Sequence, residues 1–66
     1  MNITLNGEDR VLESAKTLSE LVESLGLDVR KVAVERNLEI VPRSAYGATN
    51  LTDGDRIEIV HFIGGG

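Results

Sequence analysis

The last three residues, Gly64, Gly65 and Gly66, are the part of this chain best suited to chemistry. They follow the mostly apolar run 60–63 and end on the carboxylate of Gly66. Glycine lacks a Cβ, so another backbone can approach such a segment closely. Four extended residues at ~3.3–3.6 Å each carry the carboxylate roughly 13 Å from the body of the protein. We therefore predict a tail that enters a narrow channel of another protein. The alternative is a frayed end, since chain termini are usually poorly ordered.

The other polar residues form no pattern typical of a catalytic or metal centre. The absence of cysteine excludes disulfides, thiolate metal sites and a cysteine nucleophile, and the one histidine, His61, cannot build a metal site alone. Arg43 and His61 are catalytic candidates, but a lone charged side chain is more often solvated or in contact with a partner. We therefore predict no bound metal or cofactor and no enzymatic activity of its own.

Size and charge favour a small carrier or binding module. A chain of 66 residues makes one domain with a small core and no room for a deep pocket. The net charge of −4 argues against nucleic acid, which needs a basic surface, and suits a partner with a basic surface. No apolar stretch approaches the ~20 residues that span a bilayer. The N-terminus lacks the features of a signal peptide, so we expect a cytoplasmic protein that does not bind membranes.

The first half predicts a β-hairpin followed by a helix. Ile3 and Leu5 alternate with polar residues, Asn6-Gly7 is a hairpin signal, and residues 10–13 form the expected return strand. Because Val11 and Leu12 are adjacent, the pattern does not decide which one faces the core.

The helix has clear signals at both ends. Thr17 and Glu20 form a capping box, and Gly26 stands at the position where helices often end. Between them lies one apolar stripe at helical spacing, made of Leu18, Leu21, Val22 and Leu25. We predict that this stripe packs on the core.

The second half predicts three more strands. They cover residues 32–34, residues 38–41 before Pro42, and a last strand that begins with Ile57 and Ile59. Residues 42–46 form a turn or a single helical turn, and residues 53–55 a tight turn. One amphipathic helix on one face of a small sheet is an α+β arrangement.

The last strand also predicts a docking patch. If Ile57 and Ile59 face the helix, strand alternation turns Val60 and Phe62 to the opposite face, beside Ile63 and the glycines. An exposed apolar patch often marks a protein interface, although single apolar residues on a surface are ordinary. We assign Val60, Phe62 and Ile63 to docking.

Two segments carry a resemblance to a known family. Residues 34–43 (VERNLEIVPR), followed by the aromatic Tyr46, and residues 53–66 (DGDRIEIVHFIGGG) resemble the ThiS sulfur carriers of thiamine biosynthesis. The likeness extends over the whole chain in length and element order. It implies a ubiquitin-like β-grasp domain over residues 1–63 and a flexible glycine tail over residues 64–66.

The resemblance also implies a chemistry. A ThiF-like partner uses ATP to adenylate Gly66, a sulfur donor protein converts it to a thiocarboxylate, and a ThiG-like thiazole synthase receives the sulfur. The chain has no phosphate-binding glycine loop before a helix, so activation belongs to the partner. Two alternatives use the same tail: a MoaD-like carrier for molybdopterin synthesis and a ubiquitin-like modifier of lysines. A third alternative is a plain binding module, which would keep its function if the glycine tail were deleted.

Overall fold

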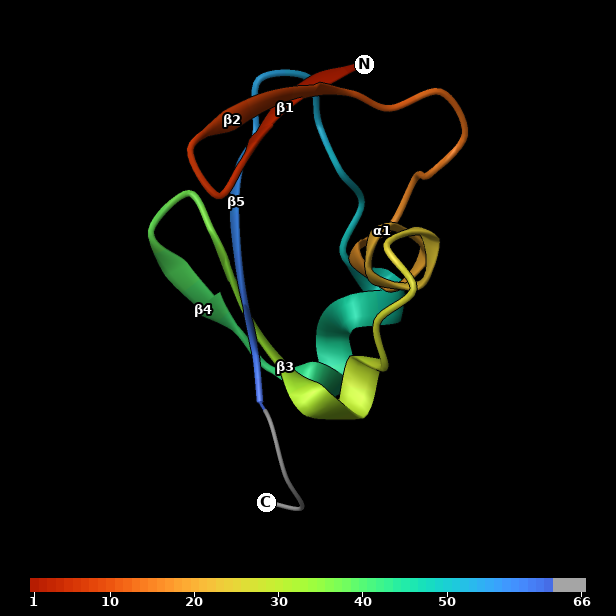
Figure 1. Ribbon diagram of the computed structural model, residues 1–66, viewed down its shortest axis with the longest axis vertical. Helices are drawn as coiled ribbons and strands as arrows, with labels where there is room; N and C mark the ends of the chain where they lie inside the picture. The colour runs from red at the N-terminus through yellow and green to blue at the C-terminus, as the bar shows by residue number, and fades with distance from the viewer. Residues whose placement is uncertain (63–66) are drawn as a thin grey trace.

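The computed structural model describes residues 1–62 and contains a single sheet of five strands in the order β2-β1-β5-β3-β4. One α-helix, α1, lies against one face of this sheet (Figure 1). The predicted α+β fold with one helix on a small sheet is confirmed. The elements in chain order are β1 (Asn2–Leu5), β2 (Glu8–Val11), α1 (Leu18–Ser24), the 3-10 helix η1 (Val29–Lys31), β3 (Val32–Arg36), β4 (Glu39–Val41), the 3-10 helix η2 (Arg43–Ala48) and β5 (Arg56–His61).

The first hairpin forms where the sequence predicted it, but its second strand is shifted. Asn6 and Gly7 have φ values of 50° and 82°, and Leu5 pairs directly with Glu8. Such a two-residue turn starts the ladder at once, so β2 covers Glu8–Val11 and the predicted strand over residues 10–13 was wrong in its bounds. Of the two adjacent apolar residues, Val11 is exposed and Leu12 packs against the core.

The α1 helix begins and ends at the predicted caps. Glu20 donates its backbone N–H to Thr17 Oγ1 (3.2 Å), and the Glu20 carboxylate accepts the backbone N–H groups of Lys16 (2.9 Å) and Thr17 (3.0 Å). These two backbone hydrogen bonds lower the pKa of Glu20. At the other end, Gly26 has a φ of 75°, and Leu27 donates to the carbonyl of Val22. The predicted signals therefore fix both ends of the helix.

The core lies between α1, η2 and the helix-side face of the sheet. β5 is central, parallel to β1 and antiparallel to β3. Tyr46 on η2 is buried, and its hydroxyl donates to the carbonyl of Val32 at 3.2 Å. η2 follows Pro42 and extends two residues beyond the predicted turn over 42–46. The buried apolar residues are Ile3, Leu5, Leu18, Leu21, Val22, Val32, Val34, Tyr46, Leu51, Ile57 and Ile59.

The second hairpin also departs from the prediction at one residue. β4 begins at Glu39, whereas Leu38 lies in the turn with a φ of 71°, so the predicted strand over residues 38–41 was one residue too long. The turn consists of Asn37 and Leu38, because Arg36 pairs with Glu39.

Within residues 1–62, no helix is long and apolar enough to cross a membrane.

Candidate functional site on the open face of the sheet

The last strand has the register that the sequence predicted. Ile57 and Ile59 are buried on the side of α1, whereas Val60 is 62% exposed and Phe62 is 49% exposed. Because successive residues of a strand point to opposite faces, Val60 belongs to the face of the sheet that no helix of residues 1–62 covers. The exposure of Val60 and Phe62 is thus confirmed, and their role in docking stays a prediction.

The neighbouring strands enlarge this apolar surface. Ala33 on β3 pairs with Val60, and Ile40 on β4 pairs with Glu35, which puts both on the same face as Val60. Ala33 is exposed, and Ile40 is 80% exposed. We call Ala33, Ile40, Val60 and Phe62 the open-face patch. Ala33 and Ile40 were not among the predicted site residues, although the alternation around the buried Val34 places Ala33 on this face.

A pair of like charges borders the open-face patch. Glu35 and Glu58 lie directly opposite each other on β3 and β5, and both are half-buried. Glu58 forms an ion pair with Arg56, with Nη2 and Oε1 3.6 Å apart. Like charges in opposite positions of two strands destabilise a sheet. This face is therefore not arranged for maximal stability of the isolated domain.

Basic side chains surround the point where the described part of the chain ends. Phe62 donates its backbone N–H to the carbonyl of Lys31 at 2.7 Å, His61 pairs with Val32, and Arg43 Nη1 donates to the carbonyl of Arg30 at 3.2 Å. The Lys31, Arg43 and His61 side chains are exposed. In a chain of net charge −4, which counts His61 as neutral, Lys31 and Arg43 place two positive charges near this point.

Arg43 and His61 occupy surface positions in this basic region. Within residues 1–62, no group of three or more histidine or acidic side chains could hold a metal ion. The side chains of Arg43 and His61 take part in no ion pair among the described residues. Their placement suits contact with a partner, in line with the interpretation preferred from the sequence.

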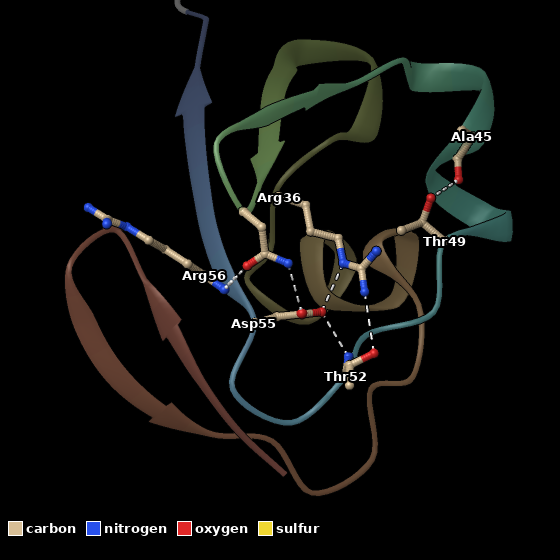
Figure 2. Close-up of polar contacts among 7 residues, drawn as sticks. Arg36, Ala45, Thr49, Thr52, Asp55 and Arg56 are labelled. Atoms are coloured by element: carbon tan, nitrogen blue, oxygen red, sulfur yellow. Dashed lines mark hydrogen bonds and ion pairs between the residues drawn. The ribbon is translucent and has the colours of Figure 1, made fainter.

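A polar network fixes the end of the sheet where β5 begins (Figure 2). The buried carboxylate of Asp55 accepts hydrogen bonds from Arg36 Nε (2.9 Å), Asn37 Nδ2 (3.1 Å) and the backbone N–H of Thr52 (2.8 Å). Arg36 Nη2 also donates to Thr52 Oγ1 at 3.3 Å. Burial raises the pKa of Asp55, but these hydrogen bonds and the Arg36 charge outweigh it, so the pKa lies below its ordinary value.

The same network joins the second hairpin to the start of β5. Asn37 exchanges two hydrogen bonds with the backbone of Arg56: its N–H donates to the carbonyl at 2.8 Å, and its Oδ1 accepts the N–H at 2.9 Å. From the sequence, residues 53–55 were predicted only as a turn. No local pattern indicates the network, because Arg36 and Asp55 are far apart in the chain and meet only through the sheet.

The remaining predicted site residues, Ile63, Gly64, Gly65 and Gly66, lie outside the described residues. Their predicted roles in docking, in reach and as the carrier of sulfur therefore stay predictions, as does the predicted domain boundary between residues 63 and 64.

Comparisons with known proteins agree on one family. The sequence profile of the ThiS family matches residues 3–66. The sulfur carrier protein ThiS of Bacillus subtilis is 43% identical over 65 residues, covering 97% of this chain and 98% of that protein. A crystal structure of the thiamine biosynthesis protein ThiS from Geobacter metallireducens superposes with a TM-score of 0.83 at 38% identity, covering all of both chains.

A second group of relatives is much longer. A thiazole synthase of Paramagnetospirillum magneticum is 54% identical over all 66 residues of this chain, and one of Magnetococcus marinus is 53% identical. The chain spans only about a fifth (20%) of the length of each. In these relatives, a domain of this kind is part of the same polypeptide as a thiazole synthase.

Proposed function

The chain belongs to the ThiS family, and from this premise we propose that it carries sulfur for the thiazole moiety of thiamine, as a thiocarboxylate on Gly66. The observation that carries the proposal is the exposed patch of Val60 and Phe62 at the end of β5, directly before a glycine tail, in a domain of this family. The chain then acts as a co-substrate of partner enzymes and not as an enzyme.

The proposed chemistry begins with activation of the terminus. A carboxylate is a poor acyl electrophile, so its oxygen attacks the α-phosphorus of ATP in a ThiF-like enzyme, which forms the acyl-adenylate and releases pyrophosphate. The outer sulfur of a persulfide on the donor protein then attacks the Gly66 carbonyl carbon, and AMP leaves, which gives an acyl disulfide between the two proteins. A second thiol, supplied by a partner, reduces the S–S bond of this adduct and forms a disulfide with the donor cysteine, which releases the terminal thiocarboxylate. The ATP belongs to the partner, and cytoplasmic localisation follows if these partners are cytoplasmic.

The short tail makes docking of the domain necessary. Four residues follow Phe62, which gives the Gly66 carboxylate a reach of roughly 13 Å. A partner that holds Gly66 in its active site must therefore lie close to the end of β5. The open-face patch is the apolar surface at this place, and exposed apolar patches of this kind are typical of protein interfaces.

The proposed acceptor is a ThiG-like thiazole synthase. Relatives at 53–54% identity combine a domain like this one with a thiazole synthase in one chain. Two proteins that occur as one polypeptide in relatives are good candidates for partners when separate. In such a pair the thiocarboxylate sulfur would pass from Gly66 to the substrate of the synthase.

The mass of the intact protein tests the proposal. With a ThiF-like enzyme, ATP and a sulfur donor, we expect a gain of about 16 Da, the mass difference between sulfur and oxygen, in the wild-type protein. Deletion of Gly66 should abolish the gain, and omission of ATP should do the same. An unchanged mass of the wild type, or sulfur transfer without Gly66, would refute the carrier function.

The two alternatives that use the tail make different products. A ubiquitin-like modifier would form a stable adduct of protein size through an isopeptide bond, with no 16 Da species. A MoaD-like carrier would form the thiocarboxylate but deliver its sulfur to a molybdopterin synthase subunit and not to a thiazole synthase. The similarity to ThiS over almost the full length of both chains favours the thiamine pathway.

A further inference from the structure

The two hairpins of this domain use the same kind of turn but different residues. Each turn has two residues of positive φ: Asn6 (50°) and Gly7 (82°) in the first, Asn37 (53°) and Leu38 (71°) in the second. Turns of this kind favour Asn-Gly, because both positions require a left-handed backbone. A bulky side chain in this region is a conformational outlier. Leu38 therefore carries a backbone cost that a glycine would avoid.

Packing within the domain does not explain the leucine. Leu38 is 72% exposed and does not belong to the hydrophobic core or to the residues packed against it. Burial of apolar surface, the usual reason to tolerate an unfavourable backbone, is thus largely absent at this position.

The rest of the structure holds the turn in place. Asn37 is bound through its backbone and side chain to Arg56, and its amide donates to the buried Asp55 carboxylate. Strained backbone persists when its surroundings over-determine it, and such positions are frequent at ligand-binding sites. An exposed leucine on a fixed, strained turn is therefore a candidate for recognition.

Leu38 lies close to the open-face patch in sequence and in strand register. Leu38 lies two residues before Ile40, which is 80% exposed on the edge strand β4. The turn is level with Ile57, because Arg36 pairs with both Glu39 and Ile57. Five residues of β5 at ~3.3 Å each separate this level from Phe62, so the turn lies roughly 17 Å from Phe62 along the sheet. The Glu35–Glu58 pair occupies part of this distance, and the apolar side chains of Ile40, Ala33 and Val60 lie beside it.

We propose that Leu38, held by the Asn37 and Asp55 contacts, is a docking residue that inserts into an apolar pocket of the thiazole synthase. This inference rests on the proposed function. The tail limits the partner to the surroundings of β5, and Leu38 lies at the end of the sheet where that strand begins, two residues from Ile40 of the open-face patch. We assign the thiazole synthase as the occupant because relatives carry that enzyme and this domain in one chain.

Two variants separate recognition from a structural role. Leu38→Gly and Leu38→Asn both relieve the backbone cost, since glycine and asparagine tolerate positive φ. We expect Tm to stay equal or to rise by a few degrees, and binding to the thiazole synthase of the same organism to weaken at least tenfold in a titration. Gly7→Leu is the matched control in the other turn, where an added Cβ meets no atom within 4 Å. It should lower Tm and leave binding unchanged.

The outcomes distinguish this inference from the proposed function. Unchanged binding of both Leu38 variants would refute the role of Leu38, and so would a fall in Tm of both, which would make Leu38 a structural residue. If the Leu38 variants bound the adenylating enzyme more weakly but bound the thiazole synthase as the wild type does, the thiazole synthase would not be the partner that contacts Leu38. If the wild-type protein fails to bind the synthase or to gain sulfur, the proposed function itself is wrong.

Discussion

The two faces of the sheet come from the same strands and differ in burial and charge. On one face Ile57 and Ile59 are buried against α1, and their neighbour Val60 points to the other face, where it is exposed. The buried face lowers the free energy of the folded state through apolar burial. The open face keeps apolar side chains in water and places Glu35 opposite Glu58.

Under the proposed function, this contrast would let a chain of 66 residues combine stability with recognition. Strand alternation separates the two tasks by a single residue along the chain. A substitution on one face should therefore change the stability and leave partner binding of the folded protein intact, whereas a substitution on the other face should do the reverse. The following predictions test this separation.

The largest effect is expected for Ile57→Ala on the buried face. Ile57 is fully buried (0% exposed), so the truncation leaves a cavity and should cost ~2–5 kcal/mol of unfolding free energy. Denaturant unfolding measures this loss. Val60→Ala on the same strand is the control, and it should change the stability by no more than about 0.5 kcal/mol. If Val60→Ala were the more damaging change, the assignment of the two faces would be reversed.

Phe62→Ala should mainly affect the partners. Aromatic residues buried at interfaces often contribute about 2 kcal/mol or more, so we expect the Kd for the ThiF-like and ThiG-like enzymes to rise more than about tenfold. The melting temperature should remain close to that of the wild type, because Phe62 is half exposed. Val11→Ala removes an exposed apolar side chain from the distant strand β2 and should leave both quantities unchanged. Equal Kd values for the wild type, Phe62→Ala and Val11→Ala would contradict the assignment of Phe62 to docking.

Asp55→Asn tests a polar contribution that belongs to neither face. The substitution removes the charge that Arg36 and Asn37 contact, and it should cost about 1–2 kcal/mol, at the lower end of the usual range because the Arg36 side chain is 31% exposed. The pKa of Asp55 is lower in the folded protein than its ordinary value of 3.8. Its contribution to stability is therefore present above about pH 4 and disappears as the pH falls through the folded pKa.

Chemical denaturation between pH 7 and pH 2 measures this dependence. The wild type should lose more stability than Asp55→Asn over the acidic part of the range, because the variant lacks the titrating group. Parallel curves for the two proteins would show that Asp55 does not contribute to the acid sensitivity.

The smallest effect is expected for Glu35→Gln on the open face. This change removes the repulsion from Glu58, so it should stabilise the domain by about 0.2–1 kcal/mol at low ionic strength, and less at high salt. Thermal unfolding of the wild type and Glu35→Gln at two salt concentrations measures this difference in stability and its dependence on salt. A destabilised variant would mean that Glu35 supports the fold and that the open face is more than a recognition surface.

Local signals in the sequence were sufficient for most elements. The capping box of Thr17 and Glu20, the stripe around Leu21, and the alternation of Ile57 and Ile59 each involve residues within a few positions of one another. Such patterns depend on backbone geometry that is the same in any protein. They predicted the helix, the hairpin, the orientation of β5 and the exposure of Val60 and Phe62, and the resemblance to the ThiS family supplied the fold.

Other features depend on contacts between distant segments, which only the tertiary structure decided. Ile40 became part of the open-face patch because β4 pairs with β3, which pairs with β5. Arg36 and Asp55 meet across the same pairing, and their network holds a leucine in a left-handed turn that local preferences disfavour. The sequence determined which residues alternate and where the first hairpin turns. The tertiary structure determined which strands are neighbours, since hydrogen bonding between strands depends on the fold as a whole and not on local spacing.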